Sequence, residues 1–260
     1  MTKILAIANQ KGGVGKTTTS VNLAASLAAA ERRVLLIDLD PQGNATTGSG
    51  VNKSALSATV YHVLLGSRSL REVRVSAKQG GYDVIPANRE LAGAEIELVD
   101  EEQREQRLRQ ALQAVVEEYD YILIDCPPAL SLLTLNGLVA AQSVMIPMQC
   151  EYYALEGLSD LVNTVKKVRA NLNPELEIEG LLRTMFDPRN ALAIQVSDQL
   201  QRHFGDKVYS TVIPRNIRLA EAPSYGTPVL FYDSASKGAL AYVALAGEFL
   251  QRREGMPAPV

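Results

Sequence analysis

The sequence predicts an α/β fold, with a single doubly wound, mostly parallel sheet flanked by helices. Short apolar runs recur along the whole chain, and several are apolar throughout, as in strands buried on both faces of a parallel sheet. Stretches with helical periodicity fill the gaps between these runs. Hydrophobic residues make up 47% and charged residues 21% of the 260 residues, which excludes a disordered or collagen-like chain.

The apolar runs give eight candidate strands. They cover residues 3–8, 33–38, 82–86, 120–125, 143–148, 178–185, 208–213 and 228–232. A helix is predicted over 105–119, with one apolar stripe formed by Leu108, Leu112, Val115, Val116 and Tyr119. Without a repeat or a composition break, we expect one domain over residues 1–253. Residues 254–260 should form a flexible tail, because the two prolines near the end cannot continue a helix.

The segment after the first predicted strand carries most of the functional information. It reads NQKGGVGKTT over residues 9–18 and leads into a helix beginning near Lys16. Glycines let a backbone wrap around phosphate oxygens, while consecutive N–H groups and the positive helix end attract the anion. We therefore predict that this loop binds the phosphates of a nucleotide through Gly12, Gly13, Val14 and Gly15.

Three polar side chains of this loop have predicted roles. Lys16 would neutralise the β- and γ-phosphates of the nucleotide, and the Thr17 hydroxyl would hold Mg²⁺. Thr18, the next residue, is placed to donate to the α-phosphate.

The loop departs from the usual phosphate-loop pattern at one position. That pattern has a glycine where this chain has Gln10, and here a second lysine follows at Lys11, before the two glycines. The Lys11 amine could reach its own nucleotide or one bound by a facing subunit.

Aspartates close two of the predicted strands. Residues 36–44 read LIDLDPQGN, so Asp38 and Asp40 lie on one face of the strand, which Pro41 ends. Asp125 ends another apolar run. Because ligands bind at the carboxyl ends of parallel strands, we expect Asp125 to hold Mg²⁺ through its water shell and Asp38 to support the metal. Asp40 would orient or deprotonate the attacking water, although the division of roles between Asp38 and Asp40 stays open.

Together these motifs resemble those of the ParA/Soj chromosome-partitioning ATPases, in the deviant Walker A group of P-loop NTPases. The resemblance extends from Lys3 to about Leu250. Its segments are KGGVGKTT, LLIDLDPQGNAT, DYILIDCPP, PMQCEYYALEG, TMFDPRN and VIPRNIRLAEAPSYG. It implies a cytoplasmic, nucleoid-associated, Mg²⁺-dependent ATPase, with ATP and Mg²⁺ as cofactors.

The resemblance also implies a mechanism. ATP would drive formation of a sandwich homodimer in which Lys11 contacts the nucleotide of the opposite subunit and Gly12 is a close-approach position. The dimer would bind double-stranded DNA without sequence preference. A ParB-type centromere-binding partner would stimulate slow hydrolysis, in which Lys11, Lys16 and Asp40 are the catalytic residues.

Four residues of the second half of the chain take roles from the same resemblance. Pro214 and Asn216 would pack against the adenine, and Arg189 and Arg218 would contact DNA. Composition alone does not indicate DNA binding, because residues 151–220 hold nine basic and nine acidic residues and the net charge is −3. Affinity would have to come from small patches joined by dimerisation, which adds avidity.

Two other functions share such a loop. A membrane-associated positioning ATPase of the MinD type needs a basic amphipathic C-terminal helix. Residues 237–253 are amphipathic, but we expect no membrane partner, because the core can take the apolar side chains Leu240, Val243, Leu245, Phe249 and Leu250. A metabolic amidotransferase or ligase would need an added glutaminase domain, for which we expect no room. We also expect no extra N-terminal DNA-reading domain, because the loop begins near residue 9.

The two cysteines, Cys126 and Cys150, are too few for a metal cage and indicate a reducing compartment. Their positions do not match the cluster-binding cysteines of the related nitrogenase iron proteins. We therefore expect them to be small buried hydrophobic residues.

Overall fold

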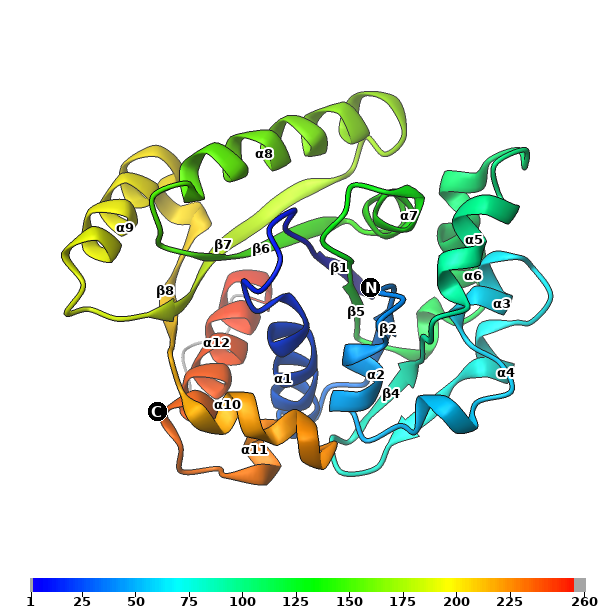
Figure 1. The fold of residues 1–260 in the computed structure, drawn as a ribbon, viewed down its shortest axis with the longest axis horizontal. Helices are drawn as coiled ribbons and strands as arrows, with labels where there is room; N and C mark the ends of the chain where they lie inside the picture. The colour runs from blue at the N-terminus through cyan, green and yellow to red at the C-terminus, as the bar shows by residue number, and fades with distance from the viewer. Residues whose placement is uncertain (1, 255–260) are drawn as a thin grey trace.

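The computed structural model describes residues 2–254, in which one sheet of eight strands lies between two layers of helices (Figure 1). The strand order is β3-β4-β2-β5-β1-β6-β7-β8, and all neighbours are parallel except β3 and β4. The strands are β1 (Lys3–Ile7), β2 (Val34–Asp38), β3 (Val75–Ala77), β4 (Tyr82–Ile85), β5 (Tyr121–Asp125), β6 (Ser143–Gln149), β7 (Glu177–Phe186) and β8 (Val208–Pro214). This arrangement confirms the predicted fold class.

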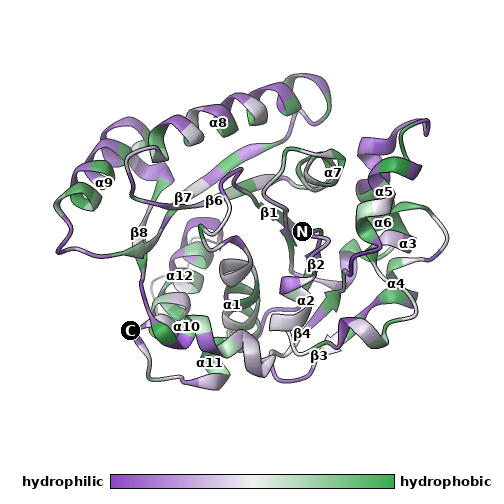
Figure 2. Ribbon diagram, viewed as in Figure 1, coloured by the Kyte–Doolittle hydropathy of each residue, from purple (hydrophilic) through white to green (hydrophobic). Residues whose placement is uncertain are grey.

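Helices connect the strands and cover both faces of the sheet. On one face lie α1 (Lys16–Ala29), α10 (Ile217–Glu221), α11 (Val229–Tyr232) and α12 (Lys237–Glu254), with α2 (Asn44–Gly48) beside α1. The other face carries α3 (Val60–Leu64), α4 (Leu70–Val73), α5 (Leu91–Glu97), α6 (Arg107–Leu112), α7 (Leu132–Ala140), α8 (Ala154–Asn171) and α9 (Ala191–Phe204). Figure 2 shows apolar residues on the strands and on the sheet-facing sides of these helices.

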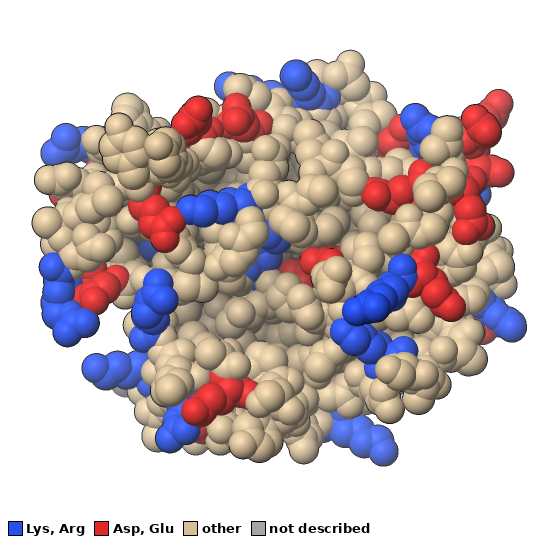
Figure 3. All heavy atoms as spheres, in the orientation of Figure 1, with Lys and Arg blue, Asp and Glu red and all other residues tan. Residues whose placement is uncertain are grey.

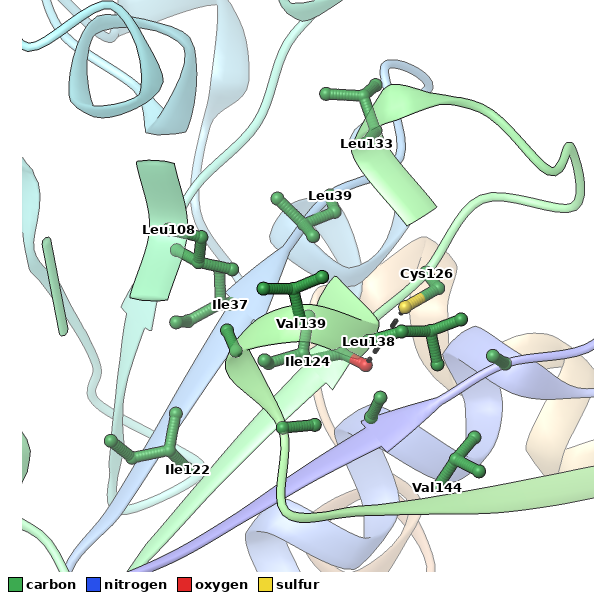
Figure 4. Close-up of a cluster of buried hydrophobic side chains, with 14 of the residues drawn as sticks. Ile37, Leu39, Leu108, Ile122, Ile124, Cys126, Leu133, Leu138, Val139 and Val144 are labelled. Carbon is green, nitrogen blue, oxygen red and sulfur yellow. Dashed lines mark hydrogen bonds between the residues drawn. The ribbon is translucent and has the colours of Figure 1, made fainter. Parts of the chain in front are cut away.

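Successive residues of the central strands point into opposite layers of the core. Leu5 and Ile7 of β1 pack with α1 and α12, whereas Ala6 between them packs with the α7 layer. In Figure 4, Ile122 and Ile124 of β5 belong to that second layer, next to side chains from α6 and α7. Burial on both sides explains why these strands are apolar throughout rather than alternating.

Two predicted elements were wrong, and one strand was missed. Residues 228–232 form α11 rather than a strand, because Pro228 has a φ of −58° and lacks an N–H, which favours the start of a helix. The segment 105–119 is divided into a 3₁₀ turn (Arg104–Gln106), α6 and a second 3₁₀ turn (Val116–Glu118), although its apolar stripe does pack into the core. The short antiparallel edge strand β3 was not predicted.

The extent of the C-terminal helix α12 was predicted correctly, but not all of the apolar side chains expected in the core are buried. Leu245 and Phe249 are buried against the sheet, whereas Leu240 is 58% exposed and Val243 42% exposed. The helix ends at Glu254, and the remaining residues of the predicted tail, 255–260, lie outside the described residues. Within residues 2–254, no helix combines the length and apolar character needed to cross a bilayer.

Candidate functional site

The glycine loop lies where the central strand β1 ends and α1 begins, between the ends of β5 and β6 (Figure 1). Gly13 and Gly15 have φ angles of 73° and 86°, in the left-handed region that strains other residues. Gly15 caps the N-terminus of α1, so the unpaired N–H groups of the first helical turn face the loop. The loop therefore presents a concave row of donors suited to an anion.

Side chains from neighbouring strands fix the shape of this loop. Asn9 donates from its side-chain amide to a β6 carbonyl at 2.8 Å, and Thr184 of β7 donates to the carbonyl of Val14 at 2.7 Å. Gln149 of β6 donates to the carbonyl of Gly13 at 3.0 Å. Sequence reasoning missed Thr184 and Gln149, because a polar residue at the end of an unrelated strand carries no local signal.

Lys16 directs its charge toward the centre of the loop. Its side chain is 7% exposed, and Nζ donates to the carbonyl of Lys11 at 3.1 Å. Burial lowers the pKa of Lys16, while the nearby carboxylates of Asp125 and Asp40 act in the opposite direction. An amine enclosed in this way offers a strong electrostatic contact to a phosphate in the loop.

The second loop lysine points elsewhere. Nζ of Lys11 forms an ion pair with Oε2 of Glu151 at 2.5 Å, and both side chains are about half exposed. Glu151 follows the end of β6 and precedes Tyr152 and Tyr153, whose rings are exposed and pack edge to face on each other.

Asp125 is completely buried beside the loop. Its Oδ2 accepts a hydrogen bond from the Thr17 hydroxyl at 2.8 Å, and its Oδ1 accepts one from Ser20 at 2.8 Å. Burial, followed by the charge of Asp38 on the adjacent strand, raises the pKa of Asp125 to about 7. Thr17 and Asp125, predicted from separate motifs, thus meet at one point.

Asp38 and Asp40 have different surroundings. Oδ2 of the buried Asp38 accepts two bonds from Thr46, one from its N–H and one from its hydroxyl, and Oδ1 accepts one from the N–H of Asp40. Burial raises the pKa of Asp38 to about 6. Asp40 is only partly buried, and its Oδ1 accepts a bond from the N–H of Gln42 at 2.9 Å. Asp38 therefore anchors α2 to the sheet, whereas Asp40 is the carboxylate nearer to solvent.

The oxygen donors at this point fit Mg²⁺. The Thr17 hydroxyl and the Asp125 carboxylate are hard oxygen ligands, and they lie within 2.8 Å of each other. In the part of the chain that the structure describes, no group of three or more His, Cys, Asp or Glu forms a complete cage. Such a donor set suits Mg²⁺, which usually keeps several waters and takes phosphate oxygens as further ligands.

A cavity of about 300 Å³ adjoins the loop. It brings the predicted pair Pro214 and Asn216 together with Gly15 and Thr18, and it is walled by apolar side chains from β8, α10 and α12. Its remaining lining residues are Thr184, Met185, Ile213, Arg215, Leu219, Ala220 and Tyr242. An apolar cavity beside a phosphate loop can hold a flat base. A larger cavity of about 950 Å³, near Thr2 at the amino ends of the strands, is lined by none of the predicted site residues.

The structure places the two predicted DNA contacts on the surface, each paired with acidic neighbours. Arg189, in the turn between β7 and α9, is 87% exposed and bonds Asp187 at 2.8 Å, which lowers the pKa of Asp187 to about 2. Arg218 of α10 contacts Glu221 at 2.8 Å and Asp233 at 3.0 Å. Arg189 precedes α9 and Arg218 lies in α10, the two helices that come directly before and after the edge strand β8 in this part of the chain (Figure 1).

The cysteines are free and buried, as predicted. Cys126 follows β5 and packs among apolar side chains in Figure 4, where its thiol points toward the carbonyl of Ile124. Burial raises the pKa of both thiols, Cys150 to about 11, so neither is a reactive thiolate.

Comparisons with known proteins agree with this geometry. A family model described as AAA domain matches residues 2–178. The sporulation initiation inhibitor protein Soj of Bacillus subtilis is 57% identical, over 95% of this chain and 98% of the relative. The chromosome partitioning protein ParA of Myxococcus xanthus is 53% identical, over 96% and 88%.

A solved structure is similar over the full chain. It is a protein from Mycobacterium smegmatis named cobyrinic acid a,c-diamide synthase, with bound ADP and magnesium, and the TM-score is 0.85. The identity is 38%, over 100% of this chain and 99% of that one. Because the partition relatives are more similar and match almost end to end, the chain belongs to the ParA/Soj family of chromosome-partitioning ATPases.

Proposed function

We propose that this protein is an ATP-dependent DNA-segregation switch. It binds ATP and Mg²⁺, forms a homodimer, binds double-stranded DNA without sequence preference in that state, and is reset by slow hydrolysis. The observation that carries the proposal is the 2.8 Å contact between Thr17 and Asp125, beside both the glycine loop and the 300 Å³ cavity. It joins a hydroxyl and a carboxylate from different elements at the place where a metal-bound triphosphate would lie.

ATP would lie along a path defined by residues already in position. The loop N–H groups and Lys16 would hold the phosphates, and the base would enter the cavity beside Pro214 and Asn216. Asn216 uses its side-chain oxygen to cap α10 by accepting from the N–H of Arg218 at 3.0 Å. The cap fixes the cavity wall that the base would contact.

Hydrolysis requires an oriented water at the γ-phosphate. Asp40 is suited to this task, because it lies beside the buried Asp38 and is still reached by solvent. When bound, Mg²⁺ would neutralise charge that develops on the phosphate oxygens. Asp125 and Thr17 would hold that ion, and Asp38, which is hydrogen-bonded to Thr46 of α2, would support it.

Dimerisation has a physical reason in this arrangement. When two phosphate loops face each other, the negative charges of the two bound triphosphates come close together. A lysine from each subunit would relieve this repulsion. Lys11 is half exposed at the mouth of the loop and could supply that cation. The exposed Tyr152 and Tyr153 next to its ion-pair partner are of the residue type enriched in protein interfaces.

DNA binding would follow from dimerisation. In one subunit, Arg189 and Arg218 are each partly neutralised by neighbouring carboxylates, so their individual attraction to phosphate is weak. Two copies held together would act on one duplex with a higher effective concentration. We propose that the protein is cytoplasmic and nucleoid-associated, and that a ParB-type partner stimulates hydrolysis.

Sedimentation with ATP, ADP or no nucleotide, each with and without a nonspecific duplex, tests this function. We expect dimers with ATP alone, and cosedimentation with DNA only where dimers form, weakening steeply with salt. The matched control is Lys16→Ala, which should stay monomeric and unbound under all conditions. Equal DNA affinity in ADP and ATP at fixed salt would contradict the proposal.

The membrane alternative has less support in the structure. The apolar side of α12 is largely used by the core, since Leu245 and Phe249 are buried, and among the described large apolar side chains of this helix only Leu240 and Val243 are exposed. We expect no retention of the ATP-bound protein on anionic vesicles. ATP-dependent retention would instead favour a positioning ATPase of the MinD type.

A further inference from the structure

A strongly acidic surface covers α5 and the turn that follows it. From Glu90 to Arg107 the chain holds seven carboxylates and two arginines, a net charge of −5, whereas the whole chain carries −3 and the remainder therefore +2. Figure 3 shows these red side chains gathered at the right-hand end of the molecule, over α5 and α6. A field of this sign attracts cationic groups and repels anionic ones such as DNA.

Two large apolar side chains lie within this acidic surface and face solvent. Ile96 near the end of α5 is 77% exposed and Val99 in the following turn is 53% exposed, whereas Leu91 and Ala94 of α5 and its C-cap Leu98 are buried. The N–H of Val99 donates to the carbonyl of Ile96 at 3.2 Å, so the two residues lie one turn of the backbone apart. The core thus uses the other face of α5, and this apolar pair with a polar rim has the composition of a protein-binding surface.

The carboxylates around the pair are only partly neutralised. Glu101 forms an ion pair with Arg107 at 2.6 Å. Asp100 and Glu102 are exposed and have no hydrogen-bond or ion-pair partner within residues 2–254. These two carboxylates can therefore accept a cationic ligand without giving up a contact.

The surface is connected to the nucleotide site through α7. Glu95 of α5 accepts a hydrogen bond from the N–H of Leu133 in the first turn of α7, at 3.4 Å. This helix follows the loop that leaves β5 at Asp125. A ligand on the outer side of α5 would therefore touch a helix that is hydrogen-bonded to α7, the helix that follows the strand carrying Asp125.

We propose that Ile96, Val99, Asp100 and Glu102, which we call the α5 patch, bind a basic amphipathic peptide segment of a partner protein. Apolar side chains of the segment cover Ile96 and Val99, while its lysines or arginines pair with Asp100 and Glu102. The match of an acidic rim to a basic segment selects this occupant over an acidic or neutral one. The inference goes beyond the proposed function, because the patch lies outside the nucleotide site and its occupation needs no ATP.

The test titrates the full chain into a fluorescent peptide that has leucines on one helical side and lysines on the other. A peptide with serines in place of the leucines is the reference and should bind more weakly. We expect Asp100→Lys with Glu102→Lys to weaken leucine–lysine peptide binding about tenfold, and Ile96→Ser to weaken it about fivefold. The matched control, Glu175→Lys with Asp198→Lys, changes the net charge equally at exposed carboxylates elsewhere and should change the affinity less than about twofold.

Three outcomes would overturn the proposal. Equal weakening by the control pair, or equal binding of the two peptides, would show attraction to net charge alone. Self-association of the chain that Asp100→Lys with Glu102→Lys abolishes would assign the patch to a second copy of the protein.

Discussion

The phosphate-loop edge and the arginine-bearing end of this molecule are built in opposite ways. At the loop, Lys16 and Asp125 are buried, and side chains of α1, β6 and β7 donate hydrogen bonds to Asp125 and to the loop backbone. At the other end, Arg189 and Arg218 are exposed and contact carboxylates close to them in the chain. The first region is organised before any ligand arrives, whereas the second gains strength only when copies of it are joined.

This difference predicts how single substitutions should act. A change at the loop removes a contact that nothing else replaces, so its effect should be large and visible in one subunit. A change at the arginine end removes one of several weak contacts, so its effect should be smaller and visible only in the dimer.

The largest effect is expected from Lys16→Ala. It removes a buried charge aimed at the phosphates, and a charge-assisted contact of up to ~3 kcal/mol corresponds to a loss of about 100-fold in ATP affinity. Turnover should become undetectable. Isothermal titration with ATP measures the affinity, and exposed Lys167→Ala on α8 is the control. Unchanged affinity would show that Lys16 is not directed at the nucleotide.

Asp40→Ala should separate binding from chemistry. We expect turnover to fall about 100-fold, because a positioned carboxylate contributes at least that much to proton transfer. ATP binding and dimerisation should persist, since Asp40 is not part of the loop. Phosphate release measures turnover and sedimentation measures the dimer. If dimers never form in this variant, Asp40 has a structural rather than a catalytic role.

Thr184→Val tests whether the strand ends hold the loop in shape. The substitution leaves the carbonyl of Val14 without the donor that bonds it at 2.7 Å. An unsatisfied buried acceptor costs about 1–3 kcal/mol, so we expect ATP affinity to fall about tenfold. Thermal unfolding with and without ATP distinguishes a loss of ATP binding from a general loss of stability. Equal destabilisation of both forms, with unchanged affinity, would mean that the bond serves only the fold.

Arg189→Glu should spare ATP binding and the dimer while reducing DNA affinity about fivefold at low salt. Its control, Arg169→Glu, makes the same charge change at an exposed position of α8. Fluorescence anisotropy with a nonspecific duplex across a salt series measures the difference. A similar loss in both variants would show that net charge, rather than this arginine, decides binding.

The fold could be predicted wherever one physical signal dominated. Strands such as β5 are buried on both faces and therefore read as uniform apolar runs. The signal failed where local and tertiary effects compete. Val229 to Tyr232 is apolar enough for a strand, yet Pro228 starts a short helix there, and Asn22 fixes it by accepting the N–H of Val229. The edge strand β3 has only three residues, too few to show a pattern.

The site divides in the same way. The loop from Asn9 to Thr18 is contiguous, so its phosphate-binding role could be predicted from the sequence. Asp125 could be predicted because ligands bind at the carboxyl ends of parallel strands. Thr184 and Gln149, which hold the loop, are far from it in the sequence. Only the pairing of β6 with β7 in the folded sheet brings them to the loop. Likewise, nothing local distinguishes Glu151 from other surface carboxylates.

Glu151→Gln should give the smallest effect. In the structure the amine of Lys11 forms an ion pair with Glu151. Lys11 must break this ion pair before its amine can contact the nucleotide of a second subunit. Because an exposed ion pair contributes about 0.2–1 kcal/mol, its loss should tighten ATP-dependent dimerisation by about two- to fivefold. Sedimentation at graded protein concentrations measures the change, and the Lys11→Ala/Glu151→Gln double variant should lose it. Weaker dimerisation in the single variant would show that Glu151 contributes to the interface instead of competing with it.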